Sequence, residues 1–80
     1  MVCPEMQQEI DELVSQIEQG FELGKMLNPS FSRQQYLDAV RKEYRELCYR
    51  ARAVEDSGQH PSEKLVIACL AHSQILKEDK

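Results

Sequence analysis

The longest run of apolar residues is at positions 65–71, which read Leu-Val-Ile-Ala-Cys-Leu-Ala. The surrounding segment, residues 61–77, is typical of a helix, and winding it at 100° per residue gives two apolar faces. The first face contains Leu65, Ala68, Cys69, His72, Ile75 and Leu76. The second face contains Val66, Ile67 and Leu70. A helix that is apolar on two faces needs cover on both.

The second face, Val66, Ile67 and Leu70, predicts that this helix has a partner. Two other helices of an 80-residue chain can shelter one broad face of this helix, so the second face would be left in water. Each of its three side chains is worth about 1.5–3 kcal/mol when fully buried. A twofold contact between third helices would cover both copies at once, and twofold dimers are the commonest oligomers. We therefore expect a homodimer with these three residues in its interface. The alternative is a compact monomer in which the chain bends at residues 20–24 and covers this face itself.

A heptad-like pattern runs through residues 4–27, where apolar residues or glycines recur every three or four positions. The positions are Met6, Ile10, Leu13, Ile17, Gly20, Gly24 and Leu27. Either glycine could end the helix, since glycine costs about 1 kcal/mol relative to alanine in a helix interior. The register continues through both, so we predict one helix over residues 4–27, with the glycines allowing another backbone to approach closely.

A second helix is predicted over residues 33–56. Ser32 and Gln35 have the spacing of a capping box, and Phe31 and Tyr36 have that of a hydrophobic staple. The apolar positions of this helix again step by three and four: Leu37, Val40, Tyr44, Leu47, Ala51 and Val54.

The stop after the second helix is Gly58, which is expected in the left-handed conformation that follows a helix C-terminus. Pro61 suits the first turn of the third helix, because its missing N–H has no partner there anyway. The short connections place neighbouring helices antiparallel. The sequence therefore predicts one all-α domain, residues 1–80: a three-helix up-down-up bundle.

The third helix is predicted to be shorter than the other two, at about 25 Å against about 35 Å. It should end before it reaches the turn between the first and second helices, and large apolar residues gather at that end. They are Phe21, Leu23, Leu27, Phe31, Tyr36 and Leu37. Exposed apolar clusters mark binding surfaces, so we expect a protein partner there. The alternative is that these residues fill a small local core beneath the turn.

Composition limits the classes of function. Hydrophobic residues make up 41% of the chain, charged residues 30%, and the net charge is −4. This acidic balance argues against a general binder of nucleic acid or anionic membranes. No apolar run approaches the ~20 residues of a membrane span, and the first residues lack the basic start and apolar core of a signal peptide. We expect a cytoplasmic protein with reduced cysteines.

Charge is divided unevenly between the first two helices. The first contains six acidic residues and one lysine, whereas the second contains six basic and five acidic residues. Arg41, Arg45 and Arg52 share one line of the second helix. They could pair with the acids of the first helix, as in a coiled coil, or form a binding surface that follows a phosphate backbone.

Candidate chemistry is sparse. Cys69 and His72 share a helix face, but a zinc site needs three or four protein ligands, so a buried thiol beside a hydrogen-bonded histidine is the favoured interpretation. No phosphate-binding loop or nucleophile motif is present. We expect no enzyme activity, no metal and no cofactor.

The expected function is that of a small protein–protein interaction module acting through apolar helix surfaces, as an adaptor, inhibitor or chaperone-like regulator. The alternative function is a nucleic-acid-associated regulator that uses the basic line of the second helix.

Overall fold

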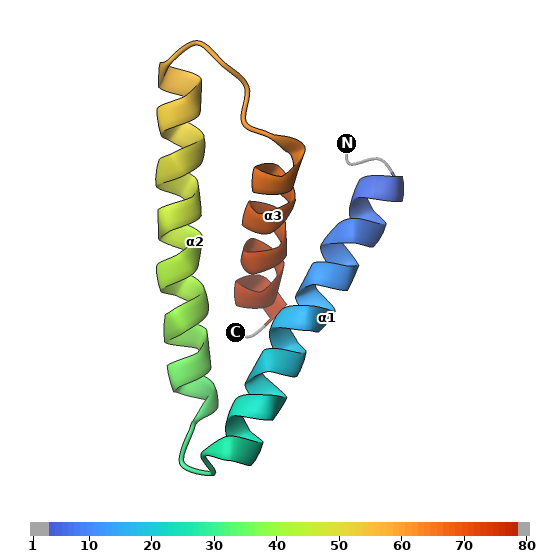
Figure 1. Ribbon diagram of the computed structural model, residues 1–80, viewed down its shortest axis with the longest axis vertical. Helices are drawn as coiled ribbons and strands as arrows, with labels where there is room; N and C mark the ends of the chain where they lie inside the picture. Colours follow the sequence, from blue (N-terminus) through green and yellow to red (C-terminus); the bar gives the residue numbers. More distant parts are fainter. Residues whose placement is uncertain (1–3, 79–80) are drawn as a thin grey trace.

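The computed structural model describes residues 4–78, which form three helices: α1 (Pro4–Leu27), α2 (Arg33–Asp56) and α3 (Glu63–Glu78). The chain runs down α1, returns up α2 and runs down again in α3, between the other two helices (Figure 1). The predicted up-down-up helical arrangement is confirmed, as are the bounds of the first two helices.

The start of α2 follows from local hydrogen bonds. The Gln35 amide donates to Ser32 Oγ at 3.2 Å, and the Ser32 amide donates to Gln35 Oε1 at 3.0 Å. The predicted capping box is therefore present, and it satisfies two amides that the first turn of a helix leaves without partners.

The connection between α2 and α3 is partly as predicted. Gly58 has φ of 86°, the left-handed conformation expected after α2. The third helix, however, begins at Glu63 and not at Pro61. Ser62 provides the reason, because its Oγ accepts a hydrogen bond from the Leu65 amide at 3.2 Å, as an N-cap residue does.

Helix α1 continues through both glycines, as predicted, but the close contact is of another kind. A Cβ on Gly24 would lie 3.0 Å from two ring carbons of Phe31, whereas a Cβ on Gly20 would meet nothing within 4 Å. The Phe31 side chain, and not the backbone of a second helix, occupies the space beside Gly24. No side chain or backbone occupies the space beside Gly20.

The core lies where α3 sits between α1 and α2, and α3 packs against both. The other two helices diverge from the turn that joins them (Figure 1). The buried cluster consists of Ile10, Val14, Phe21, Tyr36, Leu37, Val40, Ile67, Ala71 and Ile75. Ala71 and Ile75 of α3 are the most enclosed, at 0% and 1% exposure. Helix α1 therefore packs mainly against α3 and makes few contacts with α2.

The buried face of α3 differs from the predicted one. Ile67 is buried together with Ala71 and Ile75, while Leu65 and Cys69 are only half-buried. Ile67 is thus a core residue of the monomer, and its prediction as part of an external face is wrong. The physical reason is the position of α3: a helix held between two others is covered on two sides at once.

Candidate functional site

An aromatic cluster lies at the end of the molecule that α3 does not reach. We call this end the tip. The Phe21 ring stacks on Tyr36 with ring centroids 4.6 Å apart and meets Phe31 edge-on at 5.7 Å. Two cations lie over these rings, Lys25 at 5.1 Å from Phe21 and Arg33 at 5.4 Å from both Phe21 and Tyr36. The α1–α2 turn is therefore held by a local aromatic core, with added cation–π attraction.

The six residues predicted to bind a partner divide into two groups. Phe21, Tyr36 and Leu37 are buried and Phe31 is half-buried, so these residues form the local core that was the alternative. Leu23 and Leu27 remain exposed, at 60% and 88%. The prediction of an exposed cluster is therefore wrong for the aromatic residues and Leu37, and only two of its members lie on the surface.

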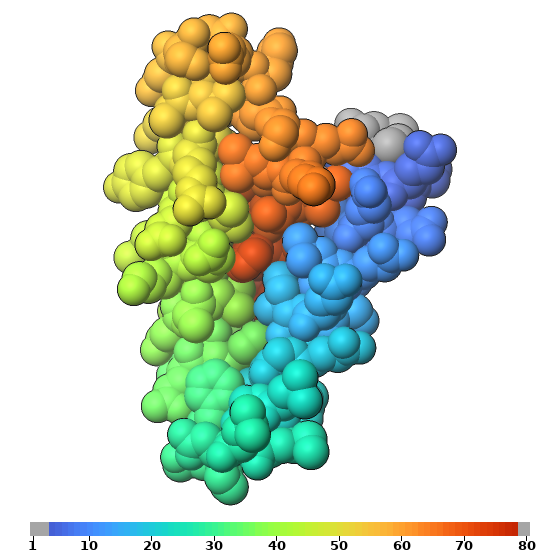
Figure 2. All heavy atoms as spheres, viewed as in Figure 1, coloured from blue at the N-terminus to red at the C-terminus, as the bar shows by residue number. Residues whose placement is uncertain are grey.

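A third exposed apolar residue joins Leu23 and Leu27. Met26 is 79% exposed and lies three positions after Leu23 and one before Leu27, on the same helix face. We call Leu23, Met26 and Leu27 the apolar tip patch. It belongs to the last turns of α1, at the lower end of the molecule in Figure 2. Met26 was not among the predicted binding residues, although its i, i+3, i+4 spacing with Leu23 and Leu27 was a signal for it.

His72 of α3 lies above the tip, at the edge of a shallow depression of about 240 Å³ between α1 and α2. Its Nδ1 is 2.7 Å from the Ala68 carbonyl oxygen, to which a proton on Nδ1 can be donated. The hydrogen-bonded histidine expected from the sequence is therefore present. Within residues 4–78, no three metal-ligating side chains come together.

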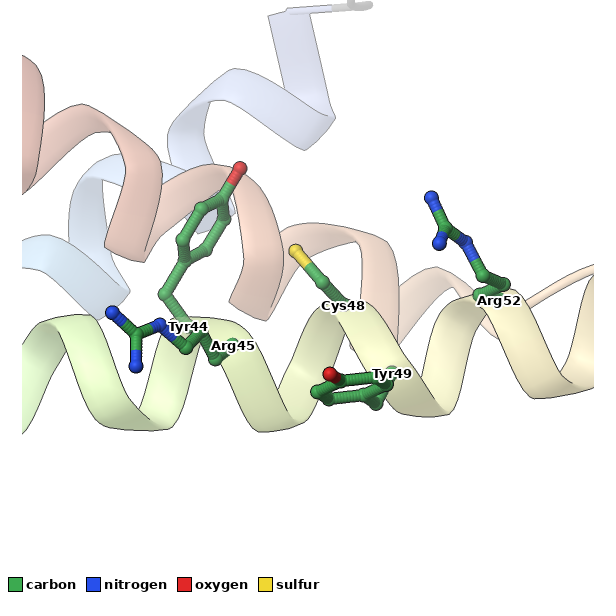
Figure 3. Close-up of a pocket in the computed structure, with 5 residues that line it drawn as sticks. All are labelled: Tyr44, Arg45, Cys48, Tyr49 and Arg52. Atoms are coloured by element: carbon green, nitrogen blue, oxygen red, sulfur yellow. The ribbon is translucent and has the colours of Figure 1, made fainter.

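The second candidate site is a hollow of about 250 Å³ on α2, lined by Tyr44, Arg45, Cys48, Tyr49 and Arg52. Tyr44 and Cys48 extend toward α3, while Tyr49 lies on the outer side of α2 (Figure 3). Tyr49 is 71% exposed. The hollow therefore combines two guanidinium groups, an exposed ring and a thiol.

The pKa values of two groups near this hollow are raised. The neighbouring Cys48 thiol raises the pKa of Tyr44. Burial raises the pKa of the Cys69 thiol, and the neighbouring Cys48 raises it further.

The basic line of α2 does not follow the coiled-coil expectation. Arg41 Nη1 lies 3.1 Å from Asp38 Oδ1 of its own helix, and Arg45 and Arg52 line the hollow. Helix α1 diverges from α2 as the two leave the turn that joins them (Figure 1). The predicted pairing of this line with the acids of the first helix is therefore replaced by an intrahelical pair at Arg41.

None of the helices within residues 4–78 combines the length and the apolar character that crossing a bilayer requires. Comparison with protein-family models, curated proteins and solved structures finds no match to this chain.

Proposed function

We propose that this protein is a small, non-enzymatic interaction module of the cytoplasm that binds another protein through the apolar tip patch. The observation that carries the proposal is the exposure of Leu23, Met26 and Leu27 on one face of α1. Apolar side chains gain about 25 cal/mol for each Å² removed from water, so a partner that covers this face gains binding free energy. The aromatic core beneath the patch holds it on a fixed backbone, which lowers the entropic cost of binding.

The partner that fits this patch is a basic amphipathic helix. Apolar residues at i, i+3 and i+4 form a short stripe along one face of a helix. Such a stripe packs against a similar apolar stripe on a partner helix. The helix that bears the stripe has six acidic residues and one lysine, a net charge of −5, and two of the acids, Glu18 and Glu22, lie within five residues of Leu23. Lysine or arginine beside the partner's apolar stripe would complement this charge, which favours correct orientation and fast association.

A second copy of the chain is the other possible occupant. The homodimer predicted through α3 now depends on Val66 and Leu70, which are half-buried, since Ile67 lies in the monomer core. Sedimentation at micromolar concentration tests it: a dimer that Leu70→Lys dissociates without unfolding would support the third-helix contact, and a monomer would exclude it.

The test of the main proposal uses a synthetic amphipathic helix of leucine and lysine as the probe. We expect Leu23→Ser with Leu27→Ser to weaken its binding by about tenfold or more, because two buried side chains are lost. Tyr49→Ser is the matched control, since Tyr49 is also large and exposed but lies on α2. A lysine–serine peptide of equal charge controls for charge attraction alone.

Equal binding to wild type and the tip variant would contradict the proposal, as would equal binding of the leucine–lysine and lysine–serine peptides. Circular dichroism and the Tm of each variant show whether the fold is retained. We expect it to be, because the replaced side chains lie outside the core.

The alternative function, association with nucleic acid, is supported by one feature of α2. The exposed Tyr49 lies between Arg45 and Arg52 at the hollow, and such residues stack on bases and attract phosphates. A single-stranded oligonucleotide is the probe, and binding should fall steeply with salt and be lost in Tyr49→Ser. Loss of peptide binding in the tip variant alone would favour the protein-binding function instead.

A further inference from the structure

The hollow on α2 is formed by a small side chain that lies among four larger ones. It has a volume of about 250 Å³ and is lined by Tyr44, Arg45, Cys48, Tyr49 and Arg52. Cys48 is the smallest of the five, and Arg45 and Arg52 lie on either side of it along α2 (Figure 3). The two arginines are seven positions apart, so they share one side of the helix and are about 10 Å apart along its axis. Each arginine therefore borders one end of the hollow.

The two tyrosines border the other two sides of the hollow. At 100° per residue, Tyr44 and Tyr49 are about 140° apart around α2, with Cys48 between them. Tyr44 is half-buried and extends toward α3, whereas Tyr49 is 71% exposed (Figure 3). An exposed tyrosine ring is a surface on which a planar ligand ring can stack.

The positive charge of the hollow is available to a ligand. Among residues 4–78, neither Arg45 nor Arg52 has an ion-pair partner. By contrast, Arg41 Nη1 on the same line of α2 lies 3.1 Å from Asp38 Oδ1. A guanidinium donates two parallel hydrogen bonds to a phosphate or a carboxylate. Two guanidiniums match a phosphate monoester better than a carboxylate, because the monoester has a charge of about −1.5 to −2 at pH 7.

The basic part of α2 is too short to follow a strand of nucleic acid. At one end Arg41 is paired with Asp38. At the other end, acidic residues follow Arg52 at positions 55 and 56. The hollow is also smaller than the sites of drug-sized ligands, which have volumes of about 300–1,000 Å³. These limits favour a ligand with one planar ring system and one phosphate over a polymer.

We propose that the hollow on α2 binds a small aromatic phosphate of the nucleoside monophosphate class. The base stacks on Tyr49, and the phosphate accepts hydrogen bonds from Arg45 and Arg52. The inference does not rest on the apolar tip patch, which uses different residues. It differs from the nucleic-acid alternative because the ligand is a single nucleotide and not a strand.

Isothermal titration calorimetry with adenosine monophosphate tests the proposal. Adenosine lacks the phosphate and ribose 5-phosphate lacks the base, so each should bind about tenfold more weakly than the nucleotide or worse. Arg45→Gln with Arg52→Gln should weaken nucleotide binding by about tenfold or more, because charge-assisted hydrogen bonds are lost. Tyr49→Ser should weaken binding of the nucleotide but not of ribose 5-phosphate.

The matched control is Lys42→Gln with Arg50→Gln. It removes the same charge from exposed positions of α2 that do not line the hollow, and it should change nucleotide binding by less than about twofold. Circular dichroism should show that every variant keeps its fold, because the replaced side chains are exposed.

Three results would overturn the proposal. The first is the absence of binding at millimolar nucleotide. The second is an equal loss of binding in the control, which would show that net charge alone attracts the nucleotide. The third is an adenylate strand that binds about a hundredfold more tightly than the single nucleotide and releases steeply with salt, which would favour the nucleic-acid alternative.

Discussion

The two ends of the bundle are held together by different kinds of side chain. Where α3 packs, the most enclosed residues of the core are aliphatic: Ile10, Ala71 and Ile75. At the tip, where α3 is absent, the rings of Phe21, Phe31 and Tyr36 fill the space between two helices.

The difference shows how the short third helix shapes the core. Ala71, with no exposure at all, lets α3 lie close between its neighbours. At the tip no third helix covers α1, and the aromatic rings fill the space between α1 and α2. The apolar tip patch lies on the outer face of α1, since Leu23 and Met26 are about 200° and about 140° around the helix from Phe21. The early end of α3 thus accounts for the aromatic core, while the patch belongs to the face of α1 that turns away from the bundle.

The largest expected effect comes from removing the central ring of the tip. Phe21→Ala should lower the free energy of unfolding by about 3–5 kcal/mol, because Phe21 contacts both other rings and the substitution leaves a cavity. Urea denaturation measures this loss. Ile75→Val, at the three-helix end, deletes one methylene and should cost about 0.5–1.5 kcal/mol. If Phe21→Ala cost no more than Ile75→Val, the tip would contribute little to stability.

A smaller effect separates the two glycines of α1. Gly20→Ala should stabilise the protein by about 0.4–1 kcal/mol, because the new Cβ meets nothing and the unfolded chain loses freedom. Gly24→Ala should destabilise it, since its Cβ would lie 3.0 Å from the Phe31 ring. The Tm of the two variants should therefore shift in opposite directions. A rise of equal size for both would show that Phe31 yields freely and that the tip is loosely packed.

The smallest effect concerns pH at the three-helix end. Cys69 and Tyr44 have pKa values raised above their ordinary 9.0 and 10.0. Both groups therefore stay protonated to higher pH in the folded protein than in the unfolded chain. The free energy of unfolding should be constant below about pH 9 and fall above it. Urea midpoints from pH 7 to 10.5 measure this fall. Cys69→Ser with Tyr44→Phe should flatten it, and an unchanged slope in that variant would assign the fall to other groups.

The helix ends were predictable because their signals are local. The capping box of Ser32 and Gln35 and the positive φ of Gly58 depend on residues a few positions apart. The start of α3 was predicted two residues too early, because the local choice lay between Pro61 and the capping Ser62. The early end of α3 also followed from length alone. The exposure of Leu23 and Leu27 was predicted, but the burial of their aromatic neighbours was not.

The sequence by itself therefore determined the three helices, their order and the end of the bundle that α3 leaves uncovered. The tertiary structure decided which face of α3 is buried, because apolar residues surround this helix and no periodicity distinguishes Ile67 from Leu65. It also decided that α1 and α2 diverge and that Tyr44 and Cys48 of α2 extend toward α3. These arrangements depend on where α3 lies between the other two helices, and such long-range packing leaves no local signal in the chain.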